Sequence, residues 1–147
     1  MPILFHVEQV KFSLAGRKIL KAWVRQVAEA EGKTIGDIAC IFCSDSYLLS
    51  LNKSYLNHDY YTDVITFDYS NGNTIAGDIF VSVDRVRDNA VDYEVSFRSE
   101  LCRVVIHGVL HLCGYHDSVE AERKIMRAKE DFYLKNLPLS SIEVELK

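Results

Sequence analysis

The stretch HGVLHLCGYHD, from His107 to Asp117, constrains the fold of this chain more than any other part of its sequence. His107 and His111 are four residues apart, so on a helix both imidazoles project from one face and can bind one metal ion. Gly114 allows the helix to end and the chain to turn back, which brings His116 or Asp117 to the open side of that ion. Three protein ligands with a vacant fourth position are typical of a catalytic zinc site.

The helix that contains the two histidines is predicted to be buried, because apolar residues run nearly all the way round it from Val104 onward. A buried imidazole needs a partner, since an unsatisfied polar group in the core is costly. The alternative to a metal site is a pair of core histidines hydrogen-bonded to carboxylates or to the backbone. Gly108 costs about 1 kcal/mol relative to alanine within a helix. Its presence indicates that another backbone element, such as a sheet, lies close to this turn.

Gly108 also occupies the position at which H-E-x-x-H metallopeptidases have their general base. A zinc peptidase of that kind is therefore disfavoured. Water would have to be activated by the metal, which can lower the pKa of bound water to about 7, or by a carboxylate from elsewhere in the chain.

The bulk properties predict one domain over residues 1–147, long enough to bury a core without disulfides. The net charge of −4 leaves nucleic acid open as a partner, because one basic face can coexist with acidic sides. The N-terminus lacks the apolar run of a signal peptide, and no stretch approaches the roughly 20 apolar residues of a membrane span. We therefore expect a cytoplasmic protein without membrane contact, whose cysteines stay reduced.

Cys40 and Cys43 form a C-x-x-C motif, which is found in metal and redox sites. The motif lies in a predicted strand, where residues three apart face opposite sides, so the two thiols diverge. No second C-x-x-C completes a zinc site. Both cysteines are interpreted as small buried hydrophobic residues.

Hydrophobic periodicity predicts the order of the elements. Strands are expected over 3–12, 37–43, 63–67 and 75–83, and helices over 14–30, 45–57, 83–93, 96–113 and 119–137. Ser13 and Ser118 are the expected N-caps of the first and last helices. Residues 138–147 are expected to form a loose tail. This order predicts an α+β domain with a small mixed sheet of about four strands, packed with helices, and with the metal site on a central buried helix.

The sequence resembles the YbeY family of bacterial ribosomal-RNA maturation endoribonucleases. The family pattern H-G-x-L-H-L-x-G-Y-D-H is similar to this chain from residue 107 to residue 115. Three further family segments are L-N…D, T-[ND]-V-L-S-F and G-D-I. Their counterparts here are residues 51–52 with Asp59, residues 62–67 (TDVITF) and residues 77–79 (GDI). The similarity thus extends over most of the chain in the same order.

The resemblance implies a zincin-like α+β fold with one Zn²⁺ ion held by three residues of the histidine motif. It implies an enzyme that cleaves single-stranded RNA, acting in maturation of the 3′ end of 16S rRNA and in ribosome biogenesis and quality control. The precursor RNA and the small ribosomal subunit would then be its partners.

The chain departs from the family pattern at the third metal ligand. The family has a histidine six positions after the second one, and this position here is Asp117. His116 lies one place earlier. A shift of one residue re-aims a side chain, so the register favours Asp117, whose oxygen is an ordinary zinc donor. His116 is the alternative third ligand.

A second departure is Leu56, where the family usually has an arginine suited to contacting phosphate. The candidates to replace that arginine are Arg85, Arg87, Arg98 and Arg103, and for each the alternative is a surface salt bridge.

Three aspartates are candidates for a base or for support of the metal ligands: Asp59, Asp63 and Asp78. Each could equally be a turn or cap residue, because aspartate favours both positions.

Three classes of function follow from these observations. The first is a zinc-dependent endoribonuclease that acts on rRNA. The second is a metallohydrolase of another substrate on the same zincin scaffold, and the third is a ribosome-assembly factor with structural zinc and no catalytic activity. An open position on the metal would favour the enzymes.

Overall fold

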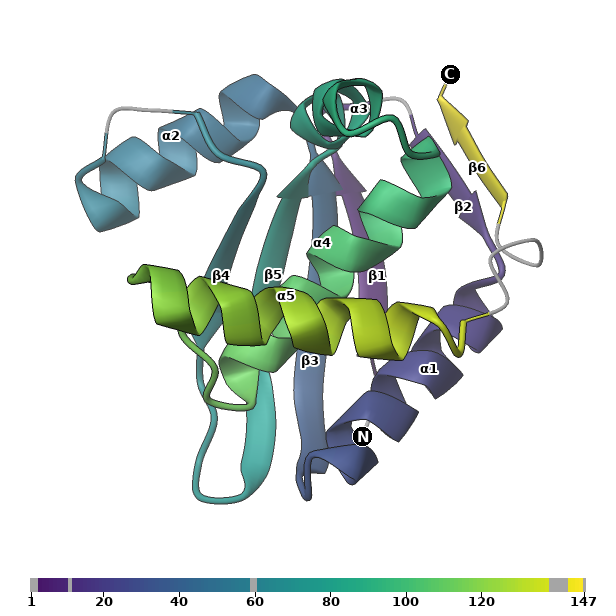
Figure 1. Ribbon diagram of the computed structural model, residues 1–147. Coiled ribbons are helices and arrows are strands. Elements are labelled where there is room, and N and C mark those ends of the chain that lie inside the picture. The colour runs from purple at the N-terminus through teal and green to yellow at the C-terminus, as the bar shows by residue number, and fades with distance from the viewer. Residues whose placement is uncertain (1–2, 11, 59–60, 138–142, 147) are drawn as a thin grey trace.

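The computed structural model describes residues 3–10, 12–58, 61–137 and 143–146, and Figure 1 shows their arrangement. Its centre is a four-stranded sheet with the strand order β1-β3-β5-β4. The strands are β1 (Ile3–Glu8), β3 (Thr34–Cys43), β5 (Thr74–Ser82) and β4 (Val64–Asp68). β1, β3 and β5 are parallel, and β4 is an antiparallel edge strand. The expected mixed sheet is confirmed.

Five helices surround this sheet within the described residues. They are α1 (Arg17–Ala30), α2 (Asp45–Leu56), α3 (Val83–Asp92), α4 (Phe97–Leu112) and α5 (Glu120–Leu134). α1 and α4 pack against one face of the sheet, and α5 crosses the outer side of α4 (Figure 1). The main core lies between these helices and the sheet. No helix among the described residues is both long and apolar enough to cross a membrane.

α4 is buried on most sides, as the sequence predicts, because it lies between the sheet and α5. A Cβ atom on Gly108 would lie 2.7 Å from Cγ2 of Ile79 on β5, closer than non-bonded carbon atoms approach in proteins. The expected close packing of the sheet at Gly108 is therefore confirmed, although the neighbour is a side chain. This contact sets the height of the two histidines above the sheet.

The cysteines of the C-x-x-C motif lie on β3 and face opposite sides of the sheet. Cys40 belongs to the main core, whereas Cys43 packs with Leu48 of α2 and Ile65 of β4 in a smaller cluster. Both thiols are free and fully buried, and burial raises the pKa of each to about 12. Their interpretation as buried apolar residues is confirmed.

The chain ends differ from the sequence prediction. A second, two-stranded sheet pairs β2 (Phe12–Ala15) with β6 (Glu143–Leu146) in antiparallel register. The expectation of a loose tail is therefore wrong for residues 143–146, where β2 satisfies the backbone hydrogen bonds of an extended segment. Residues 138–142 and 147 lie outside the described residues. The N-caps are Gly16 for α1 and Val119 for α5, so the expected caps Ser13 and Ser118 are wrong by three positions and one position.

Candidate metal centre

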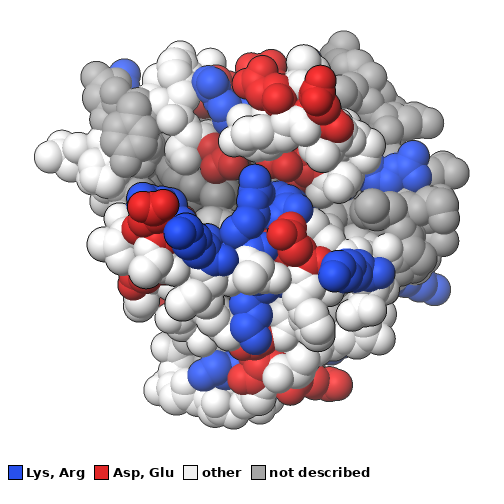
Figure 2. All heavy atoms as spheres, in the orientation of Figure 1, with Lys and Arg blue, Asp and Glu red and all other residues white. Residues whose placement is uncertain are grey.

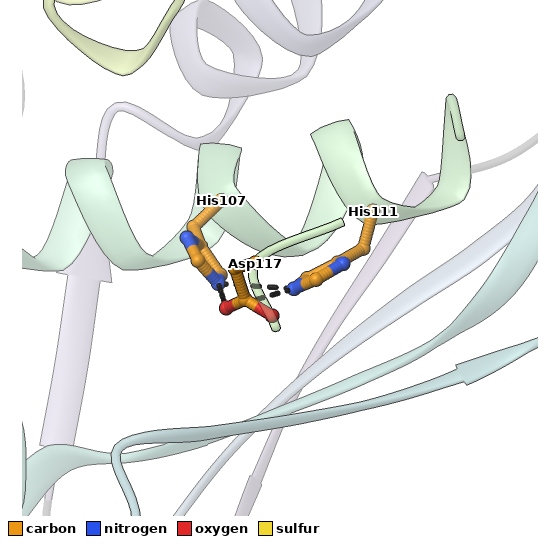
Figure 3. Close-up of side chains that lie close together, drawn as sticks. All are labelled: His107, His111 and Asp117. Carbon is orange, nitrogen blue, oxygen red and sulfur yellow. Dashed lines mark hydrogen bonds and ion pairs between the residues drawn. The ribbon is translucent and has the colours of Figure 1, made fainter. Parts of the chain in front are cut away.

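His107 and His111 lie one turn apart on α4, and Asp117 lies in the loop that follows this helix (Figure 3). The Nε2 atoms of the two histidines are 3.1 Å apart. Oδ2 of Asp117 lies 3.2 Å from Nε2 of His107 and 3.4 Å from Nε2 of His111. Gly114, with a φ of 107°, adopts the backbone conformation that the turn between helix and loop requires. Three possible ligand atoms from one short segment thus converge.

Each histidine is oriented by a hydrogen bond at its other ring nitrogen. Nδ1 of His111 lies 2.9 Å from the backbone oxygen of Tyr115, which only accepts, so this nitrogen carries the proton. Nδ1 of His107 lies 2.7 Å from Oε2 of Glu130 and donates to that carboxylate. A neutral imidazole has a single N–H. Both Nε2 atoms of the neutral histidines therefore present lone pairs.

These three atoms are suited to hold a metal ion. Two nitrogen lone pairs and a carboxylate oxygen face one another at 3.1 to 3.4 Å, and they repel one another unless a cation or a proton lies between them. In tetrahedral zinc coordination, with bonds of 2.0–2.1 Å, neighbouring ligand atoms are about 3.3 Å apart. The donor types and their spacing therefore fit zinc.

The electrostatic environment of His107 favours positive charge. Burial alone disfavours the imidazolium, but the hydrogen bond to Glu130 and the carboxylates of Glu130, Asp117 and Asp63 outweigh it and raise the pKa of His107 above its ordinary value. The same carboxylates stabilise any cation that these residues bind.

Glu130 on α5 connects the metal centre to the packing of the helices. Its side chain is buried, Oε2 accepts from His107, and Oε1 accepts from Arg103 at 2.9 Å. Sequence analysis missed this residue. The sequence pattern could have indicated it, because Met126, Glu130 and Tyr133 recur at helical spacing and form the buried stripe of α5. A carboxylate within an apolar stripe indicates a buried partner.

A second, partly buried network holds the loop of the candidate metal centre. Glu31, at the end of α1, accepts hydrogen bonds from the hydroxyls of Tyr115 and Tyr133 and from the Lys129 ammonium. Burial by itself opposes the charge of Glu31, yet these donors and the positive charge of Lys129 lower the pKa of its carboxyl group. Tyr115 lies between His111 and Asp117 in the sequence, so this network joins α1 and α5 to the ligand loop.

Two pockets open beside the three side chains. One, of about 460 Å³, is lined by His116 and residues of β4. The other, of about 320 Å³, extends between α4 and α5. His107, Asp117 and Asp63 line both pockets. The candidate ligands are therefore reachable from solvent on two sides.

The other site residues predicted from the sequence lie at different distances from the three converging side chains. Asp63 lines both pockets, accepts from Asn89 Nδ2 at 3.2 Å, and has a pKa raised by burial despite nearby His107. His116 is exposed and lines one pocket, but it is not among the three converging side chains. Asp78 lines a pocket formed with α2 on the other face of the sheet, so it is not brought to the centre. Asp59 lies outside the described residues.

Comparison with known proteins identifies the family. The family model described as Endoribonuclease YbeY matches residues 4–138. The chain belongs to the YbeY family. A protein named Endoribonuclease YbeY from Parabacteroides distasonis is 47% identical over 138 residues, which cover 94% of this chain and 97% of that protein. The YbeY protein of Flavobacterium psychrophilum is 57% identical over 113 residues, covering 77% and 81% of the two chains.

A similar fold is also found among solved structures. The solution structure of TM1509 from Thermotoga maritima matches with a TM-score of 0.62 and 28% identity, covering 90% of this chain and 88% of that one. The resemblance to the YbeY family that the sequence motifs suggest is confirmed, together with the mixed α/β architecture.

Proposed function

We propose that this chain is a metal-dependent endoribonuclease that cleaves single-stranded RNA. Its membership of the YbeY family supports the reaction class. The single observation that most supports metal dependence is the convergence of His107, His111 and Asp117, whose three lone-pair atoms lie beside two open pockets. A structural ion is instead enclosed by four protein ligands, whereas three converge among the described residues.

The proposed cofactor is one Zn²⁺ ion held by Nε2 of His107, Nε2 of His111 and Oδ2 of Asp117. When bound, it would supply Lewis-acid polarisation of a phosphoryl oxygen and a water of lowered pKa. The protein orients the ligands through Glu130 and the Tyr115 carbonyl, which hold the Nδ1 protons. Such supporting contacts fix ring orientation and ligand basicity.

Asp63 is the proposed proton acceptor of the reaction. It lines both pockets beside His107 and Asp117, and its raised pKa brings it closer to neutral pH, where a base is most effective. The hydrogen bond from Asn89 to Oδ2 holds this carboxylate in place. Asp78 has no role in this proposal because it lies on the other face of the sheet.

The proposed substrate is the precursor of 16S rRNA, cleaved during maturation of its 3′ end on the small ribosomal subunit in the cytoplasm. The resemblance of the sequence to the YbeY family supports this substrate. The four cysteines are free and three of them are buried, which agrees with a reducing compartment.

Cleavage and metal content measured together test the proposal. Purified zinc-loaded protein should cut a labelled single-stranded RNA, and should leave a duplex of the same sequence and a peptide library intact. His107→Ala and His111→Ala should lose the metal and the activity together, whereas Lys124→Ala, an exposed substitution on α5, should retain both. Full activity after complete removal of the metal would contradict the proposal.

A further inference from the structure

Three arginines line the pocket between α4 and α5 that adjoins the metal centre. Arg103 comes from α4, and Arg123 and Arg127 come from successive turns of α5. The same pocket is lined by His107 and Asp117, so it is continuous with the candidate metal ligands. Figure 2, in the orientation of Figure 1, shows blue side chains across α5 and in the hollow above it, with red side chains among them.

The three guanidinium groups differ in how far their charge is neutralised. Arg103 donates to Glu130 at 2.9 Å and to Asp131 at 2.6 Å, so its charge is fully paired. Arg123 donates to the backbone oxygens of Asp117 and Ser118, at 3.4 and 3.1 Å. Carbonyl groups orient a guanidinium without cancelling its charge. Arg123 is therefore a cation held in place beside a metal ligand.

Arg127 is only weakly paired with a carboxylate. Its guanidinium lies 5.9 Å from the ring centroid of Tyr93. Its nearest carboxylate oxygen, Oε1 of Glu130, is 3.7 Å away and already accepts from Arg103 at 2.9 Å. The side chain is 53% exposed, so its donors are accessible to a ligand in the pocket. Planar guanidinium donors of this kind match the oxygens of a phosphate.

We propose that Arg123 and Arg127 bind a phosphodiester group of single-stranded RNA next to the one that is cleaved. This inference rests on the proposed ribonuclease function and names a subsite for its substrate. The two arginines supply a phosphate contact from α5. Leu56, at the position where the family pattern has an arginine, is apolar and cannot supply one.

Salt dependence of RNA binding is the first test. We would measure the Kd of a fluorescein-labelled single-stranded RNA by anisotropy, with EDTA present to prevent cleavage. Arg127→Ala should raise the Kd about tenfold, the effect of losing one charged hydrogen-bonded contact. It should also reduce the slope of log K against log salt by about 0.7, as expected for one fewer phosphate contact on a single strand. Arg127→Lys should keep the slope.

The matched control is Lys124→Ala on the same helix. Lys124 is 77% exposed, pairs only loosely with Glu120 at 3.9 Å, and is not among the residues that line the pocket. Its removal changes the net charge by the same amount as Arg127→Ala. An equal loss of affinity in both variants would mean general attraction between a cation and RNA, and would overturn the proposed subsite.

Neutralising one phosphate at a time identifies the position of the contact. Methylphosphonate linkages, which lack the negative charge, would be placed singly along the RNA. With wild-type protein, one position beside the cleavage site should weaken binding. With Arg127→Ala the same position should have a smaller effect, because Arg123 still contacts that phosphate, and with Arg123→Ala and Arg127→Ala combined it should have none. If Arg127→Ala and the methylphosphonate each weaken binding by the same factor whether or not the other is present, the proposal is overturned.

The experiments distinguish an error in the proposed phosphate subsite from an error in the proposed ribonuclease function. If wild-type zinc-loaded protein cleaves RNA and Arg127→Ala keeps the wild-type KM and salt slope, the subsite is wrong and the nuclease function stands. If the wild-type protein neither binds nor cleaves single-stranded RNA, both proposals are wrong. The expected result is a raised KM with a kcat within a few-fold of wild type.

Discussion

The hydroxyl of Tyr115 donates a 2.6 Å hydrogen bond to the carboxylate of Glu31, 84 residues earlier in the chain. Tyr115 also provides the carbonyl oxygen that accepts the Nδ1 proton of His111. One residue of the ligand loop is therefore fixed to α1 by its side chain and to a candidate metal ligand by its backbone. The geometry of the candidate metal centre depends on the packing of α1 as well as on the motif itself.

Replacing Glu31 should weaken both the fold and the metal centre. Glu31→Ala leaves two tyrosine hydroxyls and the Lys129 ammonium without their acceptor, which should lower the free energy of unfolding by about 2–3 kcal/mol. Zinc affinity should also fall, because the loop of Asp117 is less well held. Urea unfolding and competition with a zinc chelator measure the two effects. Glu29→Ala, at an exposed position of the same helix, is the control and should change neither.

The third metal ligand can be identified by comparing two neighbouring substitutions. Asp117→Ala should reduce zinc affinity strongly and should change the visible spectrum of the cobalt-substituted protein, because one oxygen donor is lost. His116→Ala should leave both unchanged, since His116 is not among the converging side chains. The reverse pattern would show that the loop rearranges on binding and that His116 is the ligand.

Glu130 should increase the zinc affinity of the candidate metal centre through its hydrogen bond with His107. Glu130→Ala removes the acceptor of the Nδ1 proton and one carboxylate of Arg103, and we expect a 10- to 100-fold loss of zinc affinity. Asp131→Ala is the matched control, because it removes the other carboxylate of Arg103 and does not touch His107. Isothermal titration with zinc checks both variants. Equal losses in the two would assign the effect to Arg103.

Gly108 should be required by its contact with the sheet. Gly108→Ala places a Cβ 2.7 Å from Cγ2 of Ile79, and we expect destabilisation of about 1–3 kcal/mol despite the better helix propensity of alanine. Denaturant unfolding of Gly108→Ala, Ile79→Ala and the double variant forms a cycle. The double variant should lose less than the sum of the single losses, because Ile79→Ala removes the clash. Strict additivity would contradict this account.

Glu100 should make the stability of the protein depend on pH. Burial raises the pKa of its carboxyl group to about 7, against an ordinary value of 4.5 in the unfolded chain. Between these values the folded state binds more protons than the unfolded state, so the free energy of unfolding falls as the pH rises. The slope is at most about 1.4 kcal/mol per pH unit for one proton.

Urea unfolding of the metal-depleted protein from pH 4.5 to pH 8 measures this effect. Glu100→Gln cannot ionise and should flatten the profile over that range. Glu120→Gln, at an exposed position of α5, should retain the wild-type profile. If the wild-type and Glu100→Gln profiles run parallel, Glu100 does not titrate in this range.

Much of the fold was predictable from local patterns. α4 and its buried character follow from its apolar periodicity, and the divergence of Cys40 and Cys43 follows from the alternation of a strand. The pairing of β2 with β6 was missed because hydrogen bonds between short segments at opposite ends of a chain have no local signature. The N-caps were misplaced by one to three residues, which is where helix boundaries are least defined by sequence.

The sequence by itself determined the spacing of His107, His111 and Asp117 and the family to which the chain belongs. Helix geometry places two histidines on one face at a separation of four residues, so their convergence is a local property. Only the tertiary structure decided the partner of His107 and the side chains that border the site. Glu130 reaches His107 across 23 residues, and Arg123 and Arg127 border the same pocket, because α5 lies across α4. How two helices cross depends on the packing of the whole core, and no local pattern contains it.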